Sequence, residues 1–263
     1  MKHSSRRNFL KAAALMPFAF KGYAASAKKT KPLLSFSTLG CPDWTFATIV
    51  DFAAQHGYNG IELRGIQREL DLTKRPEFDS PAHIKATKEL VAAKGLKIVD
   101  LGSSAALHHS DPTLRQKNLD EGKRFIDLAT QLDCPFVRVF PNELPKTEER
   151  SKVIDLIIAG LSNLGDYAKK SNVSVILESH GDAVETKELR HIMDATASPH
   201  TGLLWDVVNM WSVTKQPPTQ VYAELKPYIR HTHIKDLTFV DGKEHYVRLL
   251  TGQAPVLEAI DAL

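Results

Sequence analysis

Three side chains of types that commonly bind metal ions stand at nearly equal intervals in the sequence. Glu178 and Asp206 each end an aliphatic run, and His233 lies in a third strand-like run, so the three are separated by 28 and 27 positions. A carboxylate buried without a partner is costly and needs a cation or a hydrogen-bond network. Two carboxylates and an imidazole suit Mn²⁺, Mg²⁺, Co²⁺ or Zn²⁺, with positions left for water or substrate. We therefore predict a divalent-metal site, with a structural salt bridge as the alternative for each carboxylate.

Other polar side chains follow the ends of similar runs and are candidates for substrate contacts. These candidates are His180, Asn209, Lys235, Glu62, Arg138 and His108. Glu62 and Arg138 have a plainer alternative, which is to pair with each other, and His108 with His109 would otherwise form a solvated loop pair. His231 shares the parity of His233 along a strand, so both are expected to point inward. We predict a supporting or structural role for His231.

Short apolar runs alternate with longer segments of helical periodicity from residue 33 onward, which is typical of βα units. The expected strands are Leu33–Thr38, Gly60–Leu63, Lys97–Leu101, Phe136–Phe140, Val173–Glu178, Gly202–Asp206 and His231–Lys235. Ser80-Pro81 and Asp111-Pro112 combine a capping residue with proline, as at the start of a helix. A long helix is expected from about Thr147 to Lys170, where apolar residues form one stripe.

The alternation favours an α/β fold of the (β/α)8 TIM-barrel type, because polar chemistry gathers at the strand ends. An open doubly wound sheet is the alternative, but Leu39-Gly40-Cys41-Pro42-Asp43 stands where such a fold places G-x-G-x-x-G. After the seventh run come a turn at Asp241-Gly242, a short run His245–Leu250 and a helix Pro255–Leu263. We therefore expect a barrel that lacks its eighth strand and helix at the C-terminus.

The motifs around these residues resemble the xylose isomerase-like TIM barrel family of sugar phosphate isomerases and epimerases. The motifs are Gly60-Ile61-Glu62-Leu63-Arg64, Ile176-Leu177-Glu178-Ser179-His180, Leu204-Trp205-Asp206 with Asn209, and His233-Ile234-Lys235-Asp236. The resemblance covers residues 33–263, and its His-x-Lys-Asp element is the most specific part. It implies that Glu178, Asp206 and His233 bind a divalent metal ion and that Glu178 also moves protons.

The second metal-binding Glu of that family, on strand eight, has no counterpart in this sequence. Our interpretation is truncation, because Pro255–Leu263 has the pattern of the helix that precedes this strand. An alternative alignment would place Thr251 or Gln253 at the missing ligand position. The absence predicts weak metal affinity and little activity for the chain as given.

The resemblance implies a divalent-metal-dependent isomerase or epimerase that acts on a sugar or polyol ketone. In this hypothesis Glu178 is the catalytic residue that removes the proton beside the carbonyl, giving an enediolate. A metal-dependent lyase or dehydratase acting on a cyclic polyol is one alternative. A degenerate barrel that binds sugar without catalysis is another.

Residues 1–27 predict a signal peptide, which leaves residues 28–263 as the barrel domain. Arg6-Arg7 precede Phe9-Leu10-Lys11 and an apolar run, and Ala25-Ser26-Ala27 offers an A-x-A cleavage site. The paired arginines resemble the bacterial twin-arginine export signal. A run this short does not span about 30 Å of hydrocarbon, so no stable membrane anchor is expected. We expect an exported, periplasmic bacterial protein.

The formal net charge of +3 comes from this first segment. The other 236 residues carry 29 basic and 31 acidic side chains, a net charge of −2. Without a basic excess, nucleic acid is not an expected partner, and this argues against the related barrels that cleave DNA. The expected partner is a small-molecule sugar or polyol.

Overall fold

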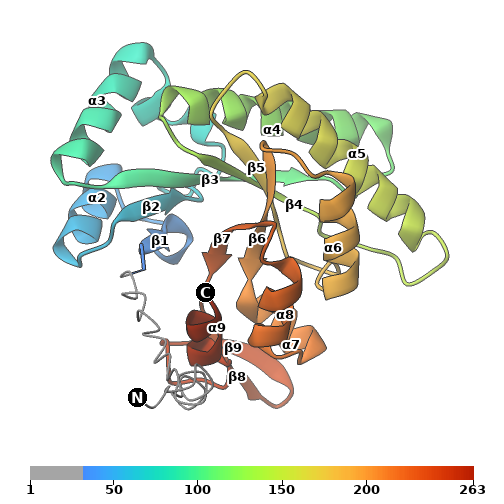
Figure 1. Ribbon diagram of the computed structural model, residues 1–263. Helices are drawn as coiled ribbons and strands as arrows, with labels where there is room; N and C mark the ends of the chain where they lie inside the picture. Colours follow the sequence, from blue (N-terminus) through green and yellow to red (C-terminus); the bar gives the residue numbers. More distant parts are fainter. Residues whose placement is uncertain (1–31) are drawn as a thin grey trace, which may run out of the picture. The chain divides into compact units, whose positions relative to one another are not determined.

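The computed structural model describes residues 32–263, and a seven-stranded parallel sheet forms its centre (Figure 1). The strands are β1 (Ser35–Ser37), β2 (Gly60–Leu63), β3 (Lys97–Ala106), β4 (Phe136–Phe140), β5 (Ser174–Glu178), β6 (Thr201–Asp206) and β7 (Ile229–His233). They lie in the order of the sequence, and every neighbouring pair is parallel. This is the topology of a (β/α) barrel, so the predicted TIM-barrel fold is confirmed.

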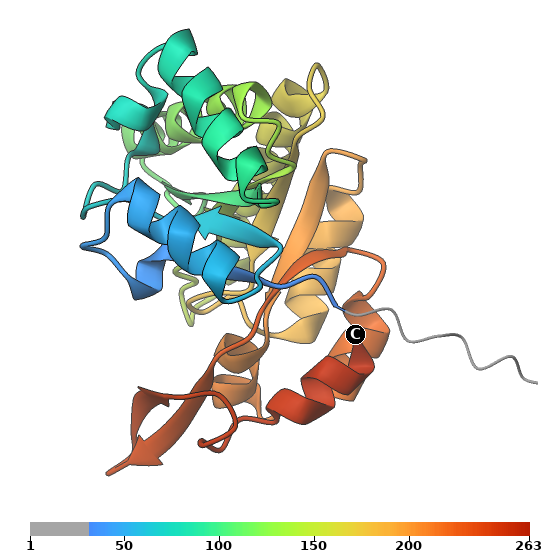
Figure 2. The same ribbon diagram turned by 90° about the vertical axis from the view of Figure 1, so that its left-hand side faces the viewer.

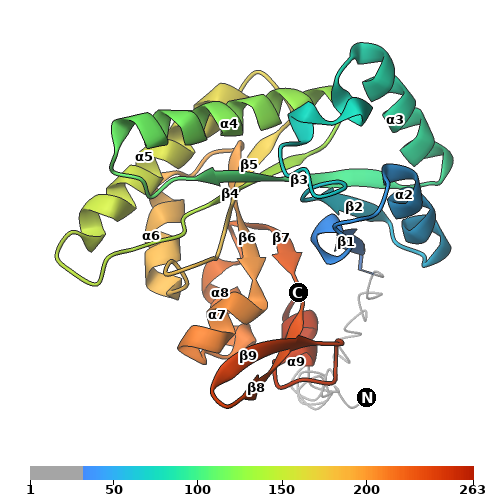
Figure 3. The same ribbon diagram turned by 180° about the vertical axis from the view of Figure 1, so that it is seen from behind.

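Helices connect the strands and cover the outside of the sheet (Figure 3). They are α2 (Phe46–Gln55), α3 (Pro81–Ala93), α4 (Pro112–Gln131), α5 (Arg150–Ala168), α6 (Thr186–Ala195), α7 (Val207–Thr214), α8 (Pro218–Leu225) and α9 (Val256–Ala262). The predicted caps of α3 and α4 are present: Ser80 accepts a hydrogen bond from the His83 amide, and Asp111 accepts one from the Leu114 amide. The long predicted helix is α5, which begins three residues later than expected.

Only β2 and β4 have exactly the predicted bounds: β5 and β6 each differ by one residue at their start, and β1 is shorter than predicted at both ends. The two largest differences are in β3 and β7. β3 continues to Ala106 instead of ending at Leu101, because its second half still pairs with β4, where Ala106 lies opposite Phe140. β7 begins at Ile229, which pairs with Leu203, and ends at His233. Lys235 therefore follows the strand instead of ending it.

The sheet is open in the part of the chain that the structure describes, because β1 and β7 form its two edges. After β7 comes an antiparallel hairpin of β8 (Asp236–Val240) and β9 (Lys243–Val247). The predicted turn at Asp241-Gly242 is confirmed, and both residues have the positive φ that a two-residue hairpin turn requires. The short predicted run from His245 overlaps β9, and the final predicted helix is α9, which lies beside α8 (Figure 2).

Asp236 anchors the segment between the hairpin and α9. Its carboxylate oxygens accept hydrogen bonds from the amides of Leu237, Gly252 and Ala254 at 2.8, 2.8 and 3.1 Å. Because Gly252 packs directly against Asp236, a Cβ at this position would clash with the carboxylate. The final residue of the His-x-Lys-Asp motif therefore has an architectural role.

Five buried charged side chains come one from each of the five central strands. They are Glu62 on β2, Asp100 on β3, Arg138 on β4, Glu178 on β5 and Asp206 on β6. A buried charge needs a partner of opposite sign or a bound ion. The side of the sheet that carries these five charged side chains is therefore the candidate location of the functional site.

No helix among the described residues 32–263 is long and apolar enough to cross a membrane. The predicted signal peptide, residues 1–27, lies outside the described residues.

Candidate metal centre

The carboxyl ends of β5, β6 and β7 bring Glu178, Asp206 and His233 together. His233 Nδ1 lies 3.5 Å from Glu178 Oε1 and 3.7 Å from Asp206 Oδ2. One ligand atom of each residue lies within 4.8 Å of the others. Metal–ligand bonds of about 2.1 Å place neighbouring ligands about 3 Å or more apart, so the three donors fit around one divalent ion.

Asp206 is held by the backbone on one side and by Lys235 on the other. Its Oδ1 accepts a hydrogen bond from the Asn209 amide at the start of α7 (2.9 Å), and its Oδ2 lies 2.9 Å from Lys235 Nζ. Lys235 also donates to Asn209 Oδ1 at 2.7 Å. Burial pushes the pKa of Asp206 upward, but His233 and Lys235 outweigh it and hold this pKa below its usual value. Asp206 is thus an ionised carboxylate next to the Lys235 ammonium group.

Glu178 is paired with Arg138 of β4. Arg138 Nε lies 3.1 Å from Glu178 Oε2, and both side chains are almost fully buried. The Arg138 guanidinium also donates to the Ser103 carbonyl at 2.6 Å and lies over the Phe140 ring. Glu178 therefore presents one oxygen to Arg138 and the other to His233.

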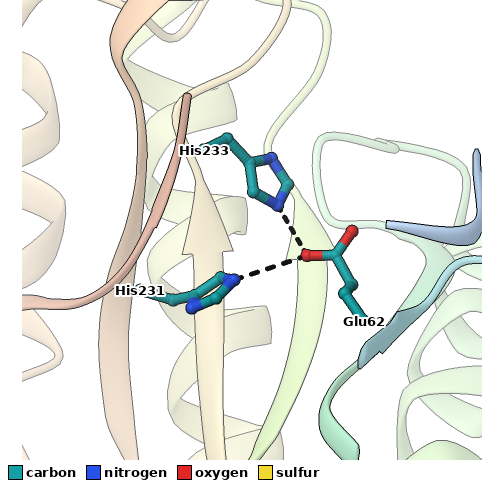
Figure 4. A group of neighbouring side chains, drawn as sticks. All are labelled: Glu62, His231 and His233. Atoms are coloured by element: carbon teal, nitrogen blue, oxygen red, sulfur yellow. Dashed lines mark hydrogen bonds and ion pairs between the residues drawn. The ribbon is translucent and has the colours of Figure 1, made fainter. Parts of the chain in front are cut away.

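A second cluster lies on the opposite side of His233 (Figure 4). His233 Nε2 lies 2.6 Å from Glu62 Oε2, and His231 Nε2 lies 3.5 Å from the same oxygen. Both histidines point inward, as their parity predicted. Burial raises the pKa of Glu62, but the two histidines outweigh it and hold this pKa well below its usual value. The alternative Glu62–Arg138 pair does not form, because each residue has a nearer partner.

Two further predicted substrate contacts, His180 and His108, form no hydrogen bond with the three metal-ligand candidates, although His180 is near enough to feel the charges of Glu178 and Asp206. His180 Nδ1 is 3.0 Å from Asn142 Oδ1, and its ring packs on Phe140. His108 packs against His109 with ring centroids 4.1 Å apart and an interplanar angle of 39°, so the two form the loop pair considered as the alternative. This pair is half-buried instead of solvated. Burial lowers the pKa of both His180 and His108, so each tends toward the neutral form.

Arg64 places a second guanidinium near Arg138. Its Nη2 donates to Ser104 Oγ at 3.1 Å, and both arginine side chains pack over Gly102, where a Cβ would clash with them. Burial and the charge of Arg138 lower the pKa of Arg64 to about 10, so Arg64 remains charged at neutral pH. In the sequence Arg64 is the last residue of the Gly60-Ile61-Glu62-Leu63-Arg64 motif, and nothing there marks its pairing with Arg138.

Asp100 on β3 is a fully buried acid that was not among the predicted site residues. Neither of its carboxylate oxygens has a hydrogen-bond partner among the described residues. Burial, followed by the nearby charge of Glu62, raises the pKa of Asp100 to about 7. The available signal was an acidic residue within the apolar stretch of the third predicted strand.

We expect Asp100→Asn to stabilise the fold above neutral pH. The folded-state pKa lies above the unfolded value of about 4, so the folded state binds more protons between these values and stability falls as pH rises through this window. Removal of the charge, less the cost of a buried amide, should raise the unfolding free energy by roughly 2 kcal/mol at pH 8. Urea denaturation without added metal measures the difference. An equal effect at pH 4.5 and pH 8 would contradict this assignment.

These features define a parallel (β/α) barrel with a candidate metal centre at the carboxyl ends of its strands. The chain belongs to the xylose isomerase-like TIM barrel family, whose model matches residues 50–261.

Two curated proteins and one solved structure show what this chain is similar to. The chain is 21% identical over 203 residues to a 3-dehydroshikimate dehydratase of Bacillus anthracis, covering 75% of this chain and 68% of the relative. It is 23% identical over 223 residues to an inosose dehydratase of Geobacillus thermodenitrificans strain NG80-2, covering 77% of this chain and 66% of the relative. The crystal structure of IOLI protein with a bound zinc atom superposes with a TM-score of 0.72 at 17% identity, covering 88% of this chain and 84% of that one. The chain thus spans about two thirds of the length of these two curated relatives.

Proposed function

We propose that this protein is a divalent-cation-dependent enzyme that removes a proton from the carbon beside a carbonyl in a sugar or polyol. The observation that carries the proposal is the convergence of Glu178, Asp206 and His233 around a space that one cation fits. The zinc ion in the structurally similar IOLI protein supports a cation in this family.

Each residue has a role that follows from its contacts. Glu178, Asp206 and His233 hold the cation, which when bound would polarise the substrate carbonyl. Glu178 is also the proposed proton acceptor, and Arg138 fixes its carboxylate in place. Lys235 and Asn209 lie beside Asp206 and offer hydrogen bonds to substrate hydroxyl groups.

Dehydration of a cyclic polyol ketone is the reaction we favour, because the two curated relatives described above are named as dehydratases. The isomerase or epimerase expected from the sequence shares the first step, in which Glu178 takes the proton. The two reactions differ in what happens next: a dehydratase expels a hydroxyl group as water, whereas an epimerase or isomerase returns a proton to the same or a neighbouring carbon.

Incubation in D₂O separates these outcomes. The protein with Mn²⁺ is mixed with inosose, 3-dehydroshikimate or a free ketose, and the products are followed by proton NMR and mass spectrometry. Loss of water identifies a dehydratase. Deuterium at the α-carbon without loss of water identifies an isomerase or epimerase. Ligand binding with neither change would contradict the proposed enzyme and leave the non-catalytic sugar-binding barrel.

Cation affinity is expected to rise with pH. Burial disfavours the charged form of His233, but Glu62, Asp206 and Glu178 outweigh it and raise the pKa of His233 well above its usual value. A cation at Nδ1 must displace the proton there, so affinity should rise about tenfold per pH unit below this pKa and level off above it. Calorimetric titration with Mn²⁺ in buffers of different ionisation enthalpy measures both the affinity and the proton release. Affinity that is independent of pH would contradict His233 as a ligand.

Export through the twin-arginine route and a periplasmic location stay predictions, because residues 1–27 lie outside the described part of the chain.

A further inference from the structure

The two ring nitrogens of His233 face groups with different requirements. Nε2 lies 2.6 Å from Glu62 Oε2, whereas Nδ1 faces Glu178 and Asp206 at 3.5 and 3.7 Å. In a neutral imidazole one nitrogen donates a hydrogen bond and the other accepts one. The partner that demands a proton therefore decides which nitrogen is left to bind a cation.

Glu62 is that partner. An ionised carboxylate only accepts hydrogen bonds, so a contact of 2.6 Å requires the proton to be on Nε2. The lone pair then lies on Nδ1, which faces Glu178 and Asp206. We propose that Glu62 is a positioning residue that fixes His233 as the Nε2–H tautomer and directs its Nδ1 toward the cation. This inference rests on the proposed metal centre.

The surroundings of Glu62 keep its carboxylate in place. Glu62 is only 3% exposed, and its strand β2 is paired on both sides, with Ser37 and Asp100 opposite Glu62. His231 approaches the same carboxylate oxygen, and the edge of one histidine ring meets the face of the other at an interplanar angle of 82° (Figure 4). The His233 ring is therefore restrained by a hydrogen bond from one side and by packing from another.

The same geometry argues against a second cation between Glu62, His231 and His233, although one donor atom of each lies within 4.8 Å of the others. Two ligands of one ion with bonds of about 2.1 Å lie about 3 Å or more apart. The 2.6 Å between Glu62 Oε2 and His233 Nε2 is shorter and has the length of a charge-assisted hydrogen bond. The distances on the Nδ1 side of the ring are long enough for a shared ion.

A carboxylate that accepts from a metal-bound histidine both orients the ring and makes it a stronger ligand, and loss of such a partner typically weakens metal affinity 10- to 100-fold. Glu62→Gln keeps the size of the side chain. Its amide group, however, would equally well donate to Nε2 and so permit the wrong tautomer. At a pH where His233 is neutral in both proteins, so that no proton competes at Nδ1, we expect about a 30-fold loss of Zn²⁺ affinity in this variant.

Asp100→Asn is the matched control. Asp100 is a fully buried acid opposite Glu62 on the neighbouring strand, and it has no hydrogen bond to either histidine. We expect this variant to change Zn²⁺ affinity by less than about threefold, because removal of a buried charge alone leaves the His233 tautomer intact. An equal loss in both variants would show a general effect of charge and would overturn the proposal.

Two measurements test the proposal. Nitrogen-15 NMR of the histidine side chains, on metal-free wild-type protein at a pH where His233 is neutral, should show the Nε2–H tautomer. The Nδ1–H tautomer would overturn the proposal without the need for any variant.

Zn²⁺ titration against a competing chelator should show higher affinity in wild type and Asp100→Asn than in Glu62→Gln. Retention of wild-type affinity in Glu62→Gln would also overturn it. Wild-type protein that shows the expected tautomer but binds no Zn²⁺ would instead contradict the metal centre itself.

Discussion

Glu178→Gln is expected to lower turnover by about 10³-fold, because it removes a proposed proton acceptor and a charged cation ligand in one step. Glutamine has nearly the same shape, so it would still fit between Arg138 and His233, which lie 3.1 and 3.5 Å from the two carboxylate oxygens. The loss of turnover should therefore arise from the missing proton acceptor and negative charge, not from a change in side-chain packing. Release of water or exchange of solvent deuterium in saturating Mn²⁺ measures it.

Glu188→Gln provides the control for this substitution. Glu188 is also paired with an arginine, Arg150, at 2.6 Å, but the pair lies at the start of α6 and contacts none of the three metal-ligand candidates. A partly exposed pair of this kind contributes little, so turnover should stay within about twofold of wild type. If Glu178→Gln also stays in this range, Glu178 is not the proton acceptor.

Asp206→Asn is expected to weaken cation affinity by at least about 100-fold. The new amide still offers an oxygen to the Asn209 backbone amide, so the cap of α7 is retained. What is lost is the negative charge, and Lys235 is left beside the site without its carboxylate partner. The variant should therefore fold normally, as measured by circular dichroism, while calorimetry shows the loss of Mn²⁺ binding.

Asp111→Asn tests whether a changed helix cap alone has this effect. Asp111 caps α4 through the Leu114 amide and lies outside the candidate centre. We expect unchanged Mn²⁺ affinity in this variant. Wild-type affinity in Asp206→Asn would mean that Asp206 serves only as the cap of α7 and as the partner of Lys235.

The sequence predicts the order of the strands and the meeting of Glu178, Asp206 and His233, because both depend on local signals. Apolar runs mark most of the strands, and parallel strands bring their carboxyl ends to the same side of the sheet. The limits of β3 were harder to predict, because its second half is rich in Gly, Ser and Ala, which have weak strand propensity.

Contacts between side chains that are far apart in the sequence could not be predicted from the sequence. Glu62 and His233 are 171 residues apart and come from strands at nearly opposite edges of the sheet, so no local pattern links them. Both Glu62 and Glu178 are candidate partners of Arg138 in the sequence, and only the three-dimensional arrangement shows that Arg138 pairs with Glu178. The role of Asp236 in fastening the segment before α9 likewise depends on backbone amides that the sequence does not mark.

The edge position of β7 has a mechanical consequence. This strand carries His233 but has a backbone neighbour on only one side in the described chain, so side-chain contacts such as the bridge from His233 to Glu62 contribute to holding it in place. An ion that binds His233 only when β7 is paired with β6 stabilises the paired form, so its binding free energy opposes local unfolding of β7. We therefore expect ion binding to slow amide hydrogen exchange along β7, because both depend on the same local unfolding equilibrium.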